Sequence, residues 1–304
     1  MEPLLVIGHS GQVGSALVSI LRKADHKFLA IDFPEIDLSK TESLPTILNE
    51  LRPGAIINAA AYTQVDRAEE EVESCRLING EAPGVIAGWC AKKQIPFIHY
   101  STDYVFSGNG DKPWREDDPV SPLSAYGQSK LLGEQTVAKA GGKWLIFRTS
   151  WIYDAKGKNF LQTMLRLAKE KDEINVVADQ IGAPTYATHL AAATLRALDK
   201  ALRSEPFPSG IYHLCNRGET SWHGFAEAII ASAKNSGISI RVNKVNAIQT
   251  KDYPTPARRP QNSRLCTDKA MRVFATELPD WGEGLSECMT IYRKLLRNLL
   301  EEQS

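Results

Sequence analysis

Tyr126 and Lys130 have the side chains and the spacing of a proton-transfer site. Positions four residues apart share one face of a helix, so a helix here directs the phenol and the ammonium into the same space. A phenol with a pKa of about 10 exchanges protons poorly at neutral pH, whereas a neighbouring cation stabilises the phenolate and lowers that pKa. The pair therefore predicts a tyrosine acting as general acid or base with help from a lysine.

Thr102 is a third candidate for this site because it follows an apolar run that predicts a strand. Strand carboxyl ends line the ligand crevice in doubly wound sheets, so the hydroxyl is expected to hydrogen-bond a substrate carbonyl. A tyrosine four residues before a lysine is also found as an ordinary exposed helical pair. The order along the chain, a glycine turn, then this threonine, then Tyr126 and Lys130, favours the catalytic interpretation.

The glycine turn is the segment Gly8–Gly14, GHSGQVG, between the first apolar run and the first amphipathic stretch. Its glycines permit a tight turn, an approach of backbone amides to a pyrophosphate, and close packing of helix on strand. Asp32 ends the next apolar run, where an acid accepts hydrogen bonds from adenosine ribose hydroxyls, although a surface or capping role is the alternative. With no lysine or arginine in 33–35, this acid favours NAD over NADP.

These candidates need a scaffold, and the first half of the chain alternates short apolar runs with longer amphipathic stretches. That alternation is typical of parallel β-α-β construction, and the nearly all-apolar runs suit a sheet covered by helices on both faces. We expect strands at 4–7, 28–31, 55–61, 96–101 and 144–148, and helices at about 11–24, 42–51 and 67–93.

After Thr149 the alternation loosens, which indicates a second and smaller lobe. There we expect helices at about 159–171, 188–203, 222–235 and 283–300, strands at 175–177 and 211–214, and a stiff loop with three prolines at 253–260. The predicted fold class is α/β, a doubly wound parallel sheet (Rossmann) over 1–150 with a smaller C-terminal substrate-binding lobe mainly over 151–304. Strands near 174–179 and 210–215 are candidates to rejoin the sheet.

Composition narrows the function classes. The 304 residues include 36 basic and 36 acidic side chains, so neither nucleic acid nor an anionic membrane surface is an expected partner. The chain has no apolar run long enough to span a bilayer and begins without a basic leader, which predicts a cytoplasmic location. Five scattered cysteines without a C-x-x-C pair argue against a disulfide framework and a zinc site.

Taken together, these motifs resemble those of the extended short-chain dehydrogenase/reductase superfamily, and within it the dTDP-4-dehydrorhamnose reductases, over essentially the whole chain. The first three matching blocks are shared with related reductases, and the last three are more specific. The blocks are Gly11–Gly14, Asn58–Ala61, His99–Phe106, Phe147–Trp151, Asp179–Thr185 and Pro254–Pro260.

The resemblance implies reduction of the C4 ketone of dTDP-4-dehydro-L-rhamnose by NADPH or NADH, the last step of dTDP-L-rhamnose synthesis for cell-surface polysaccharide. It implies a catalytic triad of Thr102, Tyr126 and Lys130. The residues that it places against the dinucleotide are Gly8, Gly11, Gln12, Val13, Gly14, Asp32, Asp37, Leu38, Ala60, Ala61, Tyr126 and Lys130. Those that it places against the nucleotide sugar are Thr102, Asp103, Tyr104 and Trp151, with Arg258 and Arg259 as candidates for the diphosphate.

The chain departs from the family pattern at a metal site. A magnesium ion held by glutamates at a dimer interface is known in the family, whereas the two corresponding positions are Ala16 and Thr188 here. Losing two hard oxygen ligands predicts that no magnesium binds. A monomer and a homodimer are then equally compatible with the sequence.

Four other functions share this scaffold. Related 4,6-dehydratases carry Thr-Asp-Glu, and the Thr102–Tyr104 segment lacks that second acid. A 4-epimerase, or a reductase of another nucleotide sugar, stays open because sequence does not reveal whether the dinucleotide is retained through turnover. A non-catalytic subunit, such as the one that accompanies methionine adenosyltransferase, keeps the glycine turn, but the intact Thr102, Tyr126 and Lys130 argue against that role.

Overall fold

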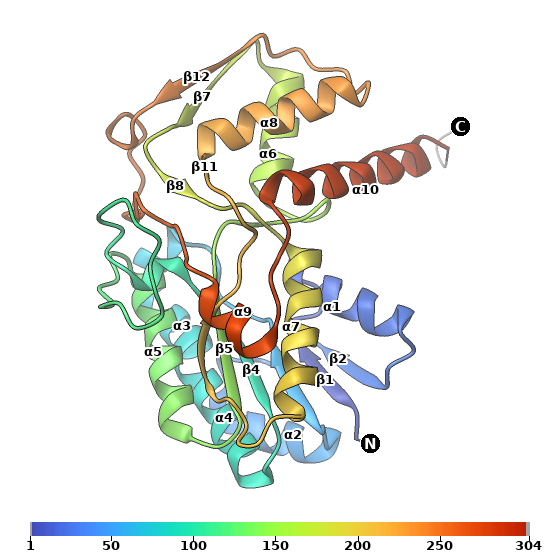
Figure 1. The fold of residues 1–304 in the computed structure, drawn as a ribbon, viewed down its shortest axis with the longest axis vertical. Coiled ribbons are helices and arrows are strands. Elements are labelled where there is room, and N and C mark those ends of the chain that lie inside the picture. Colours follow the sequence, from blue (N-terminus) through green and yellow to red (C-terminus); the bar gives the residue numbers. More distant parts are fainter. Residues whose placement is uncertain (1, 302–304) are drawn as a thin grey trace.

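A central sheet of parallel strands organises the computed structural model, which describes residues 2–301 (Figure 1). In spatial order the six strands are β10 (Gly210–His213), β5 (Trp144–Thr149), β4 (Phe97–Thr102), β3 (Ala55–Asn58), β1 (Leu4–Ile7) and β2 (Phe28–Ile31). The order reverses beside β1, which has β2 on one side and β3 on the other. In doubly wound sheets ligands bind at such a switch point, outside the carboxyl ends of the strands.

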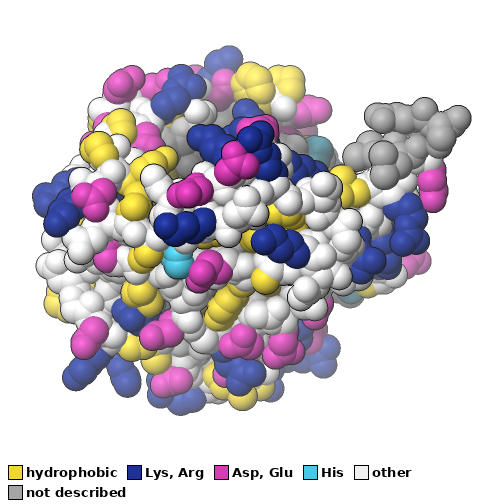
Figure 2. Space-filling model, turned by 90° about the horizontal axis from the view of Figure 1, so that it is seen from above, with side chains coloured by type: hydrophobic (Ala, Val, Ile, Leu, Met, Phe, Trp, Pro, Cys, Tyr) yellow, Lys and Arg dark blue, Asp and Glu magenta, His cyan; other side chains and the backbone are white. Residues whose placement is uncertain are grey.

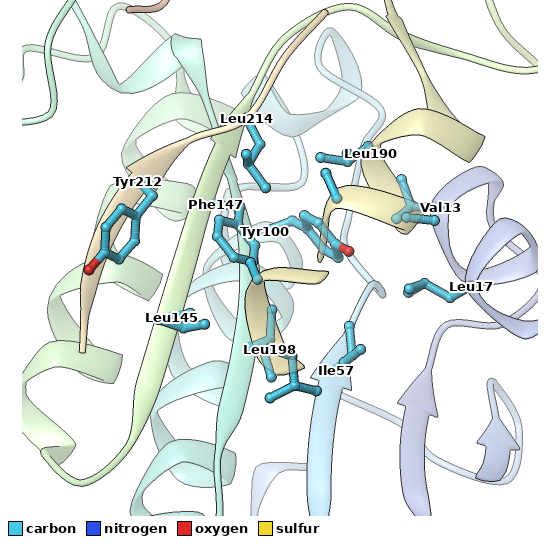
Figure 3. Packing of buried hydrophobic residues seen from close by; sticks show 14 of the residues in the cluster. Val13, Leu17, Ile57, Tyr100, Leu145, Phe147, Leu190, Leu198, Tyr212 and Leu214 are labelled. Atoms are coloured by element: carbon cyan, nitrogen blue, oxygen red, sulfur yellow. The ribbon is translucent and has the colours of Figure 1, made fainter. Parts of the chain in front are cut away.

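Helices cover both faces of this sheet because successive strand residues point to opposite sides. Val6 packs with α1 (Gln12–Lys23), α7 (Ala187–Leu202) and α9 (Asp268–Phe274), whereas Leu5 and Ile7 pack with α2 (Leu44–Leu51), α4 (Ala82–Lys93) and α5 (Ala125–Ala140). Figure 3 shows the first of these cores, where side chains of α1 and α7 cover the strands. Each fully buried Leu, Ile or Phe side chain stabilises the fold by about 1.5–3 kcal/mol.

A second hydrophobic core forms the C-terminal lobe, seen above the sheet in Figure 1. Helices α6 (Phe160–Glu170), α8 (Trp222–Asn235) and α10 (Trp281–Glu301) pack with the parallel pair β7 (Glu173–Val177) and β12 (Lys244–Ile248). Two short pairs connect this lobe to the sheet domain: β6 (Ile152–Tyr153) with β9 (Thr185–Tyr186), and β8 (Ile181–Gly182) with β11 (Thr220–Ser221).

Of the two later segments that were expected as possible strands of the central sheet, one joins that sheet and the other does not. The segment near 210–215 lies in the sheet as β10, beside β5. The segment near 174–179 does not: β7 pairs with β12 in the lobe. In β7 the exposed Glu173 and Asn175 alternate with the buried Ile174 and Val176. Such a strand has mainly one face to bury, whereas the central strands of a parallel sheet are covered on both.

The helix expected over 67–93 is confirmed from Val72 to Lys93, but its first five residues differ and it is not α-helical throughout. A 3-10 turn occupies Arg67–Glu69, and a π-helical turn at Leu77–Glu81 joins α3 (Val72–Arg76) to α4 without a break. Pro83 is one cause of the π-helical turn, because proline has no N–H to donate to the carbonyl four residues earlier. That carbonyl, of Asn79, instead packs against α5, where a Cβ added to Gly133 would approach it to 2.2 Å.

The surface carries no strong charge bias on the face shown in Figure 2, where basic and acidic side chains of the described residues are interspersed. This mixture agrees with the equal numbers of acidic and basic residues in the sequence. Within residues 2–301, no helix combines the length and the apolar character needed to cross a membrane.

Candidate active site

A cleft of about 620 Å³ opens at the carboxyl ends of the strands and is lined by residues of both the sheet domain and the C-terminal lobe. Most of the predicted site residues line it, namely Gly8, Gly11, Gln12, Val13, Asp32, Ala60, Ala61, Thr102, Asp103, Tyr104, Tyr126 and Trp151. The lining does not include Gly14, Asp37, Leu38, Lys130, Arg258 or Arg259.

The glycine turn between β1 and α1 leaves no room for side chains at two positions. Gly8 has a positive φ of 84°, and a Cβ there would lie 2.5 Å from the Ala60 amide nitrogen. A Cβ on Gly14 would lie 2.0 Å from the carbonyl oxygen of Gly8. Gly11 caps α1 without a side-chain hydrogen bond, so the first amides of the helix remain available to a ligand. An exposed helix N-terminus of this kind suits a pyrophosphate.

Gly14→Ala tests this packing. The added methyl group forces the turn away from the helix, so we expect the free energy of unfolding to fall by about 1–3 kcal/mol. We also expect NADPH to bind at least about tenfold more weakly, because the amides that face a pyrophosphate move with the turn. Thermal unfolding and fluorescence titration measure the two effects.

Gly88→Ala is the matched control for that variant, because a Cβ at this helical glycine of α4 meets nothing within 4 Å. It should preserve NADPH affinity and leave the stability unchanged or slightly increased. Equal NADPH affinity in Gly14→Ala and the unsubstituted protein would contradict the assignment of the turn.

Asp32 is hydrogen-bonded to Ser10 of the glycine turn. Its Oδ2 accepts hydrogen bonds from the Ser10 amide, at 3.0 Å, and from the Ser10 hydroxyl, and its Oδ1 accepts from the Phe33 amide at 2.9 Å. Burial raises the pKa of this carboxyl, but the bonds from Ser10 outweigh burial and leave the pKa below its usual value. Asp32 is therefore ionised at neutral pH and fixes the shape of the turn, a contribution of Ser10 that the sequence did not suggest.

Asp37 and Leu38 lie away from the cleft lining. The Asp37 carboxylate accepts hydrogen bonds from the Ser39 amide (3.0 Å) and hydroxyl (2.6 Å), and these bonds lower its pKa. Leu38 is buried in the core with α2 and α4. The geometry does not bring either side chain to the other predicted dinucleotide residues.

Thr102 ends β4, one residue beyond the expected strand, and begins a short 3-10 turn over Asp103–Val105. Its Oγ1 accepts a hydrogen bond from the Tyr104 amide at 3.2 Å and donates to Asp103 Oδ1 at 3.0 Å. The other oxygen of this buried carboxylate, Oδ2, has no hydrogen-bond partner among the described residues. Burial raises the pKa of Asp103 to about 6. The Oδ2 atom of Asp103 is therefore available to accept a hydrogen bond from a ligand beside the Thr102 hydroxyl.

Tyr126 lies in the first turn of α5, which Ser124 caps by accepting a hydrogen bond from the Gly127 amide. Its phenol lies within hydrogen-bonding reach of Thr102, and its ring meets that of Tyr104 edge to face with centroids 5.5 Å apart. Burial, and next the negative charge of Asp103, raise the pKa of the Tyr126 phenol. The predicted lowering of this pKa by Lys130 is not found: Lys130 is not among the groups that shift it, and the Lys130 nitrogen contacts His99 instead.

Lys130 follows one helical turn later but is only 2% exposed and lies behind the cleft lining. Its ammonium nitrogen is 3.3 Å from His99 Nε2. Burial lowers the pKa of Lys130 to about 8. The predicted pair therefore occupies one face of α5, with the phenol in the cleft and the amine beneath it.

Two tryptophans form a wall of the cleft that sequence analysis identified only in part. Trp151 follows β5 with a positive φ of 50°. Its ring stacks on Trp222 of α8, with centroids 3.7 Å apart and planes inclined by 13°. A Cβ on Gly182 would approach Trp151 to 2.9 Å, so the indole is held on that side as well. Trp222 stands 71 positions from its partner, and no local pattern indicated it.

The segment 154–159 connects the C-terminal lobe to the glycine turn by a hydrogen bond. Asn159 caps α6 by accepting a hydrogen bond from the Gln162 amide at 3.0 Å, and its Nδ2 donates to Gln12 Oε1 at 2.8 Å, across 147 positions. Lys158 and Asn159 both line the cleft. The sequence predicted a helix from about residue 159, but it did not indicate the contact of Asn159 with the turn.

The two arginines border a second cavity of about 400 Å³, next to the proline-rich loop. Arg259 makes a two-point ion pair with Asp66, with nitrogen–oxygen distances of 2.8 and 3.1 Å. The hydrogen bonds from Arg259 lower the pKa of Asp66. Burial, and next the charge of Asp103, raise the pKa of the Tyr104 phenol, and the Arg259 charge opposes this shift.

Comparison with known proteins agrees with this geometry. A family model described as the RmlD substrate binding domain matches residues 1–294. The chain is 46% identical over 291 residues to dTDP-4-dehydrorhamnose reductase of Burkholderia thailandensis, covering 94% of this chain and 97% of that one. It is 45% identical over 290 residues to the enzyme of that name from Escherichia coli K12, covering 94% and 96%.

Solved structures show the same similarity along the whole chain. The dTDP-4-dehydrorhamnose reductase of Bacillus anthracis, determined in complex with NADP, has a TM-score of 0.86 at 33% identity and covers 95% of this chain and 99% of that one. The protein from Clostridium acetobutylicum has a TM-score of 0.87 at 32% identity, covering 96% and 99%. The expected doubly wound fold is confirmed, and the chain belongs to the dTDP-4-dehydrorhamnose reductase family.

Proposed function

We propose that the protein reduces the C4 ketone of dTDP-4-dehydro-L-rhamnose with NADPH or NADH, producing dTDP-L-rhamnose for cell-surface polysaccharide. The observation that carries this proposal is the convergence of the Thr102 and Tyr126 hydroxyls in one cleft with the glycine turn. The names of the relatives from Burkholderia thailandensis and Escherichia coli support the choice of substrate.

The residues around the glycine turn fit a dinucleotide. Gly8 and Gly14 keep the turn free of side chains, and the first amides of α1 suit the pyrophosphate. Asp32 is placed to accept from the adenosine ribose, while Ala60 and Ala61 follow β3 on the opposite side of the switch point. When bound, the nicotinamide supplies the hydride.

The hydroxyls of Thr102 and Tyr126 act on the ketone oxygen. Tyr126 is proposed to donate to it directly, and Thr102 to donate once its single hydroxyl hydrogen turns from Asp103 Oδ1 to the ketone, so the negative charge that develops during reduction meets two donors in a desolvated site. Tyr126 then gives up its proton to the alkoxide. The raised pKa keeps the phenol protonated in the resting site, which is the form that a reduction requires. Lys130 is proposed to contact the nicotinamide ribose.

Asp103 and the Trp151–Trp222 wall are proposed to position the sugar. The unpartnered Oδ2 of Asp103 is an acceptor for a sugar hydroxyl, because a buried polar atom without a partner gains most from one supplied by a ligand. The stacked indoles offer a flat apolar surface to the deoxysugar. Arg258, beside the second cavity, is proposed to meet the diphosphate, whereas Arg259 is paired with Asp66.

Trp222→Ala is expected to raise KM for the nucleotide sugar by about tenfold with a smaller change in kcat, because the wall contributes to ground-state and transition-state binding alike. Steady-state kinetics with varied sugar concentration measure it. Trp222→Phe keeps an aromatic surface and should recover most of the loss. A change confined to KM for NADPH would assign Trp222 to the dinucleotide instead.

Oxidation of NADPH and NADH by the purified protein, followed by absorbance with enzymatically prepared dTDP-4-dehydro-L-rhamnose, tests the whole proposal. We expect oxidation of the dinucleotide and formation of dTDP-L-rhamnose. Comparing the rates with NADPH and NADH shows which dinucleotide the protein prefers. Absence of oxidation with this sugar would refute the substrate assignment. Release of near-stoichiometric NAD on denaturation would instead favour a 4-epimerase, which retains its dinucleotide through turnover.

We further propose that the protein acts in the cytoplasm without magnesium, as a monomer or a homodimer. Ala16 supports the absence of metal, since it is buried in the core between α1 and α7 and supplies no oxygen ligand.

A further inference from the structure

His99 lies in the middle of β4, fully buried between two polar side chains from neighbouring elements. Its Nδ1 is 3.3 Å from Nδ2 of Asn58, at the end of β3, and its Nε2 is 3.3 Å from the Lys130 nitrogen of α5. The ring stacks against Phe97 with planes inclined by 12°, which fixes its orientation. Each ring nitrogen therefore has one defined partner.

The backbone decides which nitrogen of His99 carries the hydrogen. The Ala60 amide donates to Asn58 Oδ1 at 3.2 Å, so the oxygen of this amide group faces the backbone and its NH2 group faces His99. An amide nitrogen only donates, so His99 Nδ1 must accept. Burial, the largest cause, lowers the pKa of His99 well below its usual value, so the imidazole is neutral. A neutral imidazole has one N–H, which is then on Nε2 and points at Lys130.

This arrangement suits an amine better than an ammonium. An ammonium only donates, so beside Nε2–H it gives a contact between two donors, whereas the lone pair of a neutral amine accepts. Two ionisable groups, Glu134 of α5 and Cys75 of α3, act on Lys130 and favour its charged form. Glu134 is already paired with Arg148, and burial raises the pKa of the Cys75 thiol and keeps it protonated. Burial of Lys130 itself lowers its pKa to about 8.

We propose that Asn58 and His99 stabilise the neutral amine form of Lys130 in the free protein, so that at mildly alkaline pH Lys130 takes up a proton when a dinucleotide binds. His99 is in this sense a positioning residue. The inference rests on the proposed placement of the nicotinamide ribose beside Lys130, where ribose hydroxyls accept from an ammonium. Dinucleotide affinity and protonation are then linked, so binding weakens as the pH rises.

Proton uptake on NADPH binding tests this linkage directly. At pH 8, calorimetry in buffers of different ionisation enthalpy should report about half a proton taken up per NADPH bound. Above that pH, Kd should rise by about tenfold per pH unit until Lys130 deprotonates in the complex as well. NADPH binding with no proton uptake would overturn the inference alone, whereas failure of NADPH to bind at all would refute the proposed function.

Asn58→Asp replaces the side-chain amide with a carboxylate of almost the same shape, and it is expected to reverse which ring nitrogen of His99 carries the hydrogen. A carboxylate accepts from both Ala60 and His99, so the N–H moves to Nδ1 and the free Nε2 accepts from the Lys130 ammonium. Lys130 is then charged before NADPH binds. We expect proton uptake at pH 8 to fall close to zero, and the pH at which Kd begins to rise to increase by about one unit or more. Unchanged uptake in a folded Asn58→Asp protein would overturn the inference.

The carboxylate introduced by Asn58→Asp also attracts the Lys130 ammonium electrostatically, independently of the His99 tautomer. His99→Phe separates this charge effect from the tautomer effect. Phenylalanine keeps the ring and removes both nitrogens, so in that background Asn58→Asp should shift the pH dependence of Kd much less. An equal shift in both backgrounds would assign the effect to charge and refute the role of the tautomer. Thermal unfolding establishes that each variant is folded, and if Asn58→Asp is not, His99→Phe alone should reduce the uptake.

Discussion

Tyr126→Phe is expected to lower kcat for ketone reduction by a factor on the order of 10² or more while leaving NADPH affinity nearly unchanged. The substitution removes the proton donor and one of two hydrogen bonds to the developing alkoxide, and both act only as the reaction proceeds. The phenol lies on α5 and not in the glycine turn, where the pyrophosphate of the dinucleotide is proposed to bind, and its ring is retained in the variant. Single-turnover absorbance with saturating sugar and a fluorescence titration of NADPH measure the two quantities.

Tyr100→Phe is the control for loss of a buried tyrosine hydroxyl. This residue is also in β4, but its hydroxyl donates to Thr194 of α7 at 2.8 Å, on the side of the sheet away from α5. Removing that hydroxyl should change stability modestly and kcat little. If Tyr126→Phe keeps its full turnover, the phenol is not the proton donor and the mechanism fails, even though the cleft remains.

Glu134→Ala is expected to cause the largest loss of stability, about 3–5 kcal/mol, because it leaves a buried guanidinium without its partner. Glu134 accepts from Arg148 Nε at 2.8 Å and Nη2 at 2.7 Å, and it also accepts from the Ser101 hydroxyl. The two side chains are 2% and 3% exposed. The pair joins α5 to β5 directly beneath the catalytic face. Chemical denaturation of the two proteins measures the difference in the free energy of unfolding.

Glu170→Ala is the matched control, since Glu170 pairs with Arg166 at 2.8 Å on the surface of α6, where both side chains are more than half exposed. Solvent screens that pair, so its loss should change stability little. Equal destabilisation by the two variants would contradict the assignment of a buried ion pair. Replacing Glu134 and Arg148 together by apolar residues of similar volume should recover much of the loss, because no charge is then left unpaired.

Local sequence patterns were sufficient for the scaffold. The strands at 4–7 and 28–31 and the helix at 222–235 are confirmed residue for residue, because their apolar periodicity and flanking turns are encoded within each segment. The helix expected over 67–93 is present from Val72 to Lys93, but its π-helical turn was not predictable, because that turn depends on Pro83 together with the packing on α5. The partner of β7 was not predictable, since strand pairing depends on residues about 70 positions away.

The sequence by itself determined most strands and helices of the sheet domain and the glycine turn, since each depends on neighbours within a few residues, and it placed Thr102, Tyr126 and Lys130 at the ends and faces of those elements. Only the tertiary structure decided that Trp222 stacks on Trp151, that Asn159 contacts Gln12, and that His99 lies between Asn58 and Lys130. It also reversed the expected direction of the Tyr126 pKa shift. The charge states of these groups depend on burial, and the long-range contacts depend on tertiary packing. Neither can be inferred from the spacing of residues along the sequence.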